Sequence, residues 1–122
     1  MDELMISITR MNGLMVVTVR GELDIVGKPL LCTRIDDALR TGDGPLVIDL
    51  SGVSFIDAQG LSALMVSRRH ATELNRSLAL AGVSAVVRRL LQLTKLEDSF
   101  VMMAPPDTVS PSNARDLLAW MQ

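Results

Sequence analysis

Few residues in this chain of 122 could perform acid–base or nucleophilic chemistry. The only histidine is His70, and an acid–base pair between His70 and Asp57 would be the sharpest catalytic hypothesis. The two residues lie at or in one predicted helix, thirteen positions apart. At a rise of about 1.5 Å per residue, they are separated by about 20 Å along the helix axis. They therefore cannot hydrogen-bond to each other, and we interpret His70 as a surface residue of that helix.

The single cysteine, Cys32, has no recognisable base or cation to activate it, so we interpret it as a partly buried thiol. One histidine and one cysteine cannot make a multi-ligand metal site without several carboxylates. Glycines cluster at 42–44 and recur at 52 and 60, but neither GxxxxGK[ST] nor GxGxxG occurs. We therefore expect no enzyme activity, no cofactor and no bound metal.

The composition argues against several other classes of protein. Apolar residues make up 48% of the chain and charged residues 21%, which is typical of a globular domain. The net charge is −2 with acids and bases mixed, so we expect neither nucleic-acid binding nor a polybasic membrane surface. The acidic N-terminus does not resemble a signal peptide, and no apolar run approaches the ~18 residues of a transmembrane helix. We expect one cytoplasmic domain over residues 1–122, without direct membrane insertion.

The first third of the chain predicts a β-hairpin followed by a helix. Residues 4–10 alternate apolar and polar side chains, 11–13 carry a turn signal, and 14–23 read as a second strand. From residue 28 the apolar spacing becomes helical up to about residue 40, with a proline in the first turn. The residues predicted to share the buried face of this helix are Leu30, Leu31, Ile35, Ala38 and Leu39.

The rest of the chain alternates strands and helices. Residues 41–45 end the first helix, and the almost wholly apolar run 46–50 favours a central strand buried on both faces. The later predicted elements are a helix from Asp57 to about Leu74, a strand at 77–82, a helix at 84–96 capped by Ser84, a strand at 100–104, a loop at 105–112 and a helix at 113–122. This order predicts an α/β domain with a mixed, mostly parallel sheet of about five strands and about four helices.

The second helix opens on a residue suited to both capping and binding. Asp57 is placed as its N-cap, where a carboxylate accepts the first N–H groups and faces the positive end of the helix dipole. Leu61, Leu64, Met65 and Arg68 share one face of this helix. Helix N-termini that follow parallel strands are also where α/β proteins place anion and partner sites.

Residues 47–65, VIDLSGVSFIDAQGLSALM, closely resemble the central signature of the STAS family of anti-sigma factor antagonists and related modules. Residues 19–25 and 83–100 also resemble the family, so the likeness covers about residues 4 to 120. It implies a regulatory protein that binds an anti-sigma factor, usually a serine kinase of the GHKL type, and so releases a sigma factor for transcription. A STAS accessory subunit of a membrane lipid-transport ATPase is the alternative, and self-association as a homodimer is left open.

The resemblance also implies a regulatory position, which is altered here. In the family, a kinase phosphorylates a serine at the start of the second helix and switches binding off. Ala58 occupies that position and has no hydroxyl, and Gln59 cannot substitute for it. Either the natural protein lacks the switch or an alanine has replaced a natural serine, and Gln59, another departure from the pattern, favours the first. Ser54 and Ser62 are close in sequence but lie off the acceptor position.

The partner surface that the resemblance implies centres on the same helix start. Asp24 and Asp57 would offer carboxylates to basic groups of the partner, and Gly60 would let the partner's backbone approach. Leu61 and Leu64 are expected to face inward. The residues predicted to bind the partner are Asp24, Asp57, Ala58, Gln59, Gly60, Ser62 and Ala63, with Gln59, Ser62 and Ala63 on the exposed edge.

Overall fold

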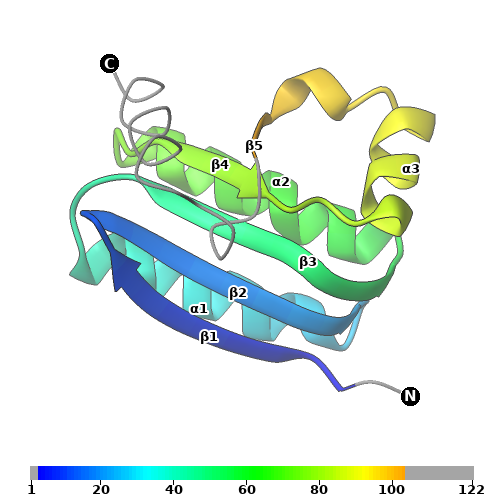
Figure 1. Ribbon diagram of the computed structural model, residues 1–122, viewed down its shortest axis with the longest axis horizontal. Helices are drawn as coiled ribbons and strands as arrows, with labels where there is room; N and C mark the ends of the chain where they lie inside the picture. Colours follow the sequence, from blue (N-terminus) through cyan, green and yellow to red (C-terminus); the bar gives the residue numbers. More distant parts are fainter. Residues whose placement is uncertain (1–2, 104–122) are drawn as a thin grey trace.

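The computed structural model describes residues 3–103, which form one mixed five-stranded sheet with three α-helices (Figure 1). The sheet order is β1-β2-β3-β4-β5, with β1 and β2 antiparallel and the other neighbours parallel. The predicted α/β class and mixed sheet are thus confirmed. The elements are β1 (Met5–Met11), β2 (Leu14–Leu23), α1 (Gly27–Thr41), β3 (Leu46–Ile56), α2 (Ala58–Glu73), β4 (Leu78–Ala81), α3 (Ala85–Leu93), the 3₁₀ turn η1 (Glu97–Ser99) and β5 (Val101–Met103).

Two of the predicted elements, the loop at 105–112 and the helix at 113–122, lie outside the described residues. Within those residues, none of the helices is both long and apolar enough to cross a bilayer.

The predicted hairpin is confirmed, and its turn explains the abrupt reversal of the chain. Asn12 and Gly13 both have positive φ, 53° and 81°, and Met11 pairs directly with Leu14 across the turn. Two residues with left-handed backbone match the twist of the flanking strands, which is why Asn-Gly suits this position. The hairpin leaves β1 at one edge of the sheet and places β2 between β1 and the central strand β3.

The third strand is longer than predicted, because β3 continues from Leu46 to Ile56 instead of ending at residue 50. Ser51 and Gly52 resemble a turn in sequence, yet β2 is ten residues long and offers a backbone ladder over the whole stretch. Register shifts between β2 and β3 absorb the irregular segment. The strand therefore reaches Ile56, which pairs with Leu23 just before α2 begins.

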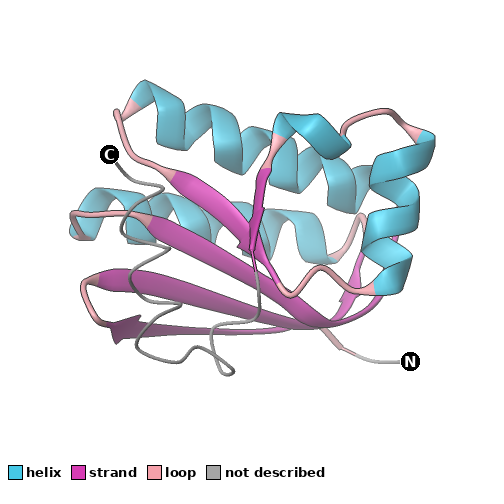
Figure 2. Ribbon diagram, turned by 45° about the horizontal axis from the view of Figure 1, so that its top comes forward, coloured by secondary structure: helices cyan, strands magenta, loops and turns pink. Residues whose placement is uncertain are grey.

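The two long helices lie side by side on one face of the sheet, as Figure 2 shows. Leu31, Ile35, Ala38 and Leu39 of α1 are buried in the core, as predicted. Leu30 was predicted to join them, but 44% of it is exposed. The reason is rotational: Leu30 lies about 100° around the helix from Leu31, beyond the edge of the buried stripe.

The third helix starts at the predicted cap residue but not through the predicted contact. Ser84 occupies the N-cap position of α3, yet it makes no side-chain capping bond there. Its hydroxyl donates instead to the carbonyl oxygen of Val53, 3.0 Å away in β3. Ser84 thus ties the start of α3 to the central strand, a long-range contact that local sequence does not reveal.

Candidate functional site

The start of α2 is built on Asp57, as the sequence predicts. Asp57 has extended backbone, and its Oδ1 accepts the N–H groups of Gln59 at 2.9 Å and Gly60 at 3.0 Å. These bonds satisfy two of the N–H groups that a helix leaves unpaired at its first turn. The carboxylate also opposes the positive end of the helix dipole. Asp57 is therefore a confirmed N-cap.

Asp24 performs a similar task at the start of α1. Its Oδ1 accepts the N–H groups of Val26 and Gly27, both at 3.0 Å, and its carbonyl oxygen accepts that of Lys28 at 2.9 Å. Sequence reasoning assigned Asp24 only to partner contact, and the structure adds this capping. Since α1 follows β2 and α2 follows β3, both capped helix starts lie at the carboxyl edge of two paired parallel strands.

Lys28 connects these two helix starts and was missed by the sequence analysis. Its Nζ donates to Ser62 Oγ at 3.1 Å and to Gln59 Oε1 at 3.4 Å, reaching from α1 to the first turns of α2. A cation in the first turn of a helix is disfavoured by the helix dipole. That unfavourable position was the available signal that Lys28 serves a contact outside its own helix.

Gly60 is required by an internal contact that the sequence analysis did not predict. Gly60 is buried, and a Cβ at this position would collide with the carbonyl oxygen of Leu23 and lie 2.9 Å from Ile56 Cγ1. The glycine thus lets α2 approach the end of β2 closely. Gly60 is buried, so a large side chain there would disturb the fold as well as any binding.

The exposed corner of the site is smaller than predicted. Ala58 and Gln59 are exposed, while Asp57 and Ser62 are half-buried. Ala63 is fully buried, so its predicted place on the exposed edge is wrong. Ala63 lies one turn beyond Gly60 on the α2 face that packs into the domain. Leu61 and Leu64 are buried, as expected.

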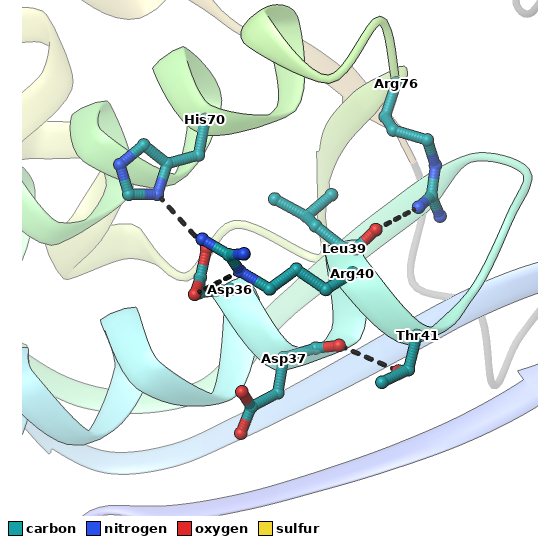
Figure 3. A network of polar contacts seen from close by, with 7 residues as sticks. All are labelled: Asp36, Asp37, Leu39, Arg40, Thr41, His70 and Arg76. Atoms are coloured by element: carbon teal, nitrogen blue, oxygen red, sulfur yellow. Dashed lines mark hydrogen bonds and ion pairs between the residues drawn. The ribbon is translucent and has the colours of Figure 1, made fainter.

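His70 lies on another part of α2 and contacts α1. Its Nδ1 is 3.8 Å from Asp36 Oδ1, and the other oxygen of that carboxylate binds Arg40 Nε at 2.8 Å (Figure 3). The His70–Asp36 contact links the last turn of α2 to α1, whereas the Asp36–Arg40 pair lies within α1. In the part of the chain that the structure describes, no cluster of three or more His, Cys, Asp or Glu residues could hold a metal ion.

Cys32 is half-buried in α1, as predicted from its place beside the apolar stripe. Burial raises the pKa of the Cys32 thiol, and the positive charge of Lys28 partly opposes that rise. The raised pKa favours the neutral thiol over the nucleophilic thiolate. Since the unfolded chain would ionise first, this group stabilises the fold below its unfolded pKa, and that contribution is lost as the pH rises through the folded value.

Arg76 occupies the opposite end of the helix pair. Its Nη1 donates to the carbonyl oxygens of Leu39 and Gly42, both at 2.7 Å, and its Nε donates to that of Gly44 at 2.5 Å. Figure 3 shows the side chain reaching toward the end of α1. One guanidinium thus ties the last turn of α1 and the loop before β3 to the start of β4.

Comparison with known proteins identifies the family. The STAS domain family model matches residues 5–112. The anti-sigma-F factor antagonist RsfB of Mycobacterium tuberculosis is 28% identical over 101 residues, covering 81% of this chain and 80% of the relative. An anti-sigma-B factor antagonist of Staphylococcus aureus is 29% identical over 82 residues, covering 67% and 76%.

A solved structure agrees over almost the full length. An anti-sigma factor antagonist from Mycobacterium paratuberculosis superimposes with a TM-score of 0.79 at 26% identity, covering 99% of this chain and 97% of the other. The order of elements, the mixed sheet and the match over most of the sequence agree with one another. The chain belongs to the STAS domain family.

Proposed function

We propose that this chain is an anti-sigma factor antagonist: it binds an anti-sigma factor of the GHKL serine-kinase type and thereby frees a sigma factor for transcription. Both relatives described above carry names of this class. The observation that carries the proposal is the exposed corner at Ala58 and Gln59, held between the capped starts of α1 and α2. It stands where the family resemblance puts the contact with the kinase.

The partner contacts this corner and its rim. Ala58 and Gln59 offer exposed side chains, and Asp24 and Asp57 supply negative charge from the two helix starts. Such rim charges chiefly increase the rate of encounter with a basic partner and define its orientation, and buried apolar contacts provide most of the affinity. The capping bonds hold both carboxylates in place, so little conformational entropy is lost when a partner binds.

The proposed antagonist acts without the family's phosphoswitch at this corner. A phosphate on residue 58 would add nearly two negative charges beside the Asp57 carboxylate, and such repulsion would weaken an interface. The Ala58 methyl group cannot accept a phosphate. Ser62 is a poor replacement for the missing phosphate acceptor, because it is half-buried and its Oγ already accepts a hydrogen bond from Lys28 Nζ at 3.1 Å.

The test uses Ala58→Ser, because Ala58 is exposed and the variant restores only the missing hydroxyl. The chain and the variant are incubated with GHKL-type anti-sigma kinases from the source organism and ATP, and intact mass is measured. We expect the unmodified chain to bind a kinase by calorimetry and to gain no phosphate. The variant should gain one phosphate and then bind at least about tenfold more weakly, a cost of about 1.4 kcal/mol.

Ser62→Ala is the matched control for the location of any phosphate. Phosphate on the unmodified chain that disappears in Ser62→Ala would contradict the proposal that the chain acts without phosphorylation. Failure to bind every such kinase, with capture of a membrane transport ATPase from lysate instead, would favour the accessory-subunit alternative.

A further inference from the structure

A cavity of about 380 Å³ lies beside the start of α1. Its apolar wall is formed by Leu4, Val26 and Leu30, and its carboxylates come from Glu3, Glu22 and Asp24. We call this site, defined by these six residues, the acidic-rimmed cavity. Gly27 also lines it, and a Cβ there would lie 2.8 Å from Leu4 Cδ2 and 3.3 Å from the carbonyl oxygen of Glu22. The glycine thus allows β1, β2 and α1 to meet at this point.

Large apolar side chains at the cavity mouth are exposed to solvent. Val26 and Leu30, one helical turn apart, line the cavity and are 81% and 44% exposed, and Ile25, next to Val26 in the chain, is 64% exposed. Single exposed apolar residues are common on protein surfaces, but a contiguous group around a concavity is typical of an interaction site. None of these three side chains belongs to the buried core, so their apolar surface is available to a partner.

The charge around the cavity selects the kind of partner. Three of its lining residues are acidic, and none of the described residues that line it is basic. Lys28 follows the lining residue Gly27 in the chain, but its ammonium is directed to Ser62 and Gln59 of α2. The carboxylates therefore lack an ion pair from Lys28. An apolar wall with an acidic rim complements an aliphatic side chain flanked by basic residues.

We propose that the acidic-rimmed cavity receives an aliphatic side chain of the anti-sigma partner, with an adjacent arginine or lysine on the rim carboxylates. This inference rests on the proposed function and extends its interface from α2 to the start of α1. The two surfaces are adjacent: Asp24 lines the cavity and caps α1, and Lys28 of α1 contacts Gln59 and Ser62 at the start of α2.

The first experiment tests the chemistry of the cavity with short synthetic peptides and needs no natural partner. One peptide carries a leucine between two arginines, the second a leucine between two glutamates, and the third a serine between two arginines. We expect only the first to produce saturable NMR shifts at the amides of Leu4, Val26 and Leu30. Equal shifts with all three peptides, or none at these amides, would overturn the inference.

The second experiment uses paired variants and a kinase that binds the unmodified chain. Val26→Ser with Leu30→Ser removes the exposed apolar wall, and we expect the affinity to fall at least about tenfold. Leu74→Ser with Leu93→Ser is the matched control, because those leucines are 48% and 69% exposed away from the cavity. Circular dichroism establishes that both double variants are folded.

The outcomes separate the two proposals. Equal affinity of the cavity variant and the control for the kinase would overturn the cavity inference and leave the anti-sigma function standing. Selective peptide shifts without binding to any anti-sigma kinase would support the cavity chemistry while contradicting the proposed function. The double variant Glu3→Gln with Glu22→Gln removes two of the three rim carboxylates. It should lower the affinity for the peptide with a leucine between two arginines and reduce the salt dependence of that binding.

Discussion

The two ends of the α1–α2 pair use opposite charges to satisfy opposite backbone groups. At the start of the helices, the carboxylates of Asp24 and Asp57 accept N–H groups. At the far end, the guanidinium of Arg76 donates to three carbonyl oxygens, one of them in the last turn of α1. Both arrangements follow from the helix dipole, whose positive end favours anions and whose negative end favours cations.

The ends differ in what remains available to another molecule. Arg76 uses its Nε and Nη1 within the domain, and it joins three segments of one chain. At the carboxylate end, Ala58 and Gln59 of α2 are exposed, and so is Val26, which lines the acidic-rimmed cavity. Hydrogen bonds to the helix ends thus have a structural role at the Arg76 end, and at the other end they leave a surface suited to recognition. Substitutions at three positions test this division.

The largest expected effect is that of Gly60→Ala, which would place a methyl group against the Leu23 carbonyl oxygen. We expect the free energy of unfolding to fall by about 3 kcal/mol, because backbone cannot yield as a flexible side chain can. Urea denaturation measures this change. Gly52→Ala is the control: its methyl would lie 2.7 Å from Arg20 Cγ, in an exposed side chain that can move. If both variants lost the same stability, the close approach at Gly60 would not be the cause.

The second-largest loss of stability is expected for Arg76→Met. This variant removes three charge-assisted hydrogen bonds while keeping much of the side-chain volume. We expect a loss of about 2 kcal/mol in unfolding free energy and no change in partner affinity. Thermal denaturation and calorimetry with the bound kinase measure the two quantities. Arg69→Met, at an exposed position of α2, is the control. A drop in partner affinity at unchanged stability would contradict the structural assignment of this end.

The smallest effect on stability is expected at Asp57, where two variants separate capping from charge. Asp57→Ala removes the acceptor of two N–H groups and should cost about 1 kcal/mol. Asp57→Asn keeps an acceptor oxygen and should leave stability nearly unchanged while lowering the association rate with a basic partner. Denaturation and stopped-flow binding measure these effects. Unchanged association kinetics in Asp57→Asn would assign Asp57 to capping alone.

The local patterns predicted most of the fold correctly. Asn12–Gly13 indicated the hairpin, and the apolar spacing of Leu31, Ile35 and Ala38 indicated α1. The errors arose where distant segments meet. The extension of β3 to Ile56 depends on pairing with β2, and the hydroxyl of Ser84 finds Val53 instead of its own helix.

For the site, the sequence by itself determined the capping role of Asp57, the absence of a hydroxyl at residue 58, and the separation of His70 from Asp57. These follow from residue type and from spacing along one helix. Tertiary structure alone decided that Gly60 faces the Leu23 carbonyl oxygen, that Lys28 reaches Ser62, and that Ala63 is buried. Each depends on how α2 packs against β2 and α1. Such contacts join segments far apart in the chain, so they produce no local sequence pattern from which they could be predicted.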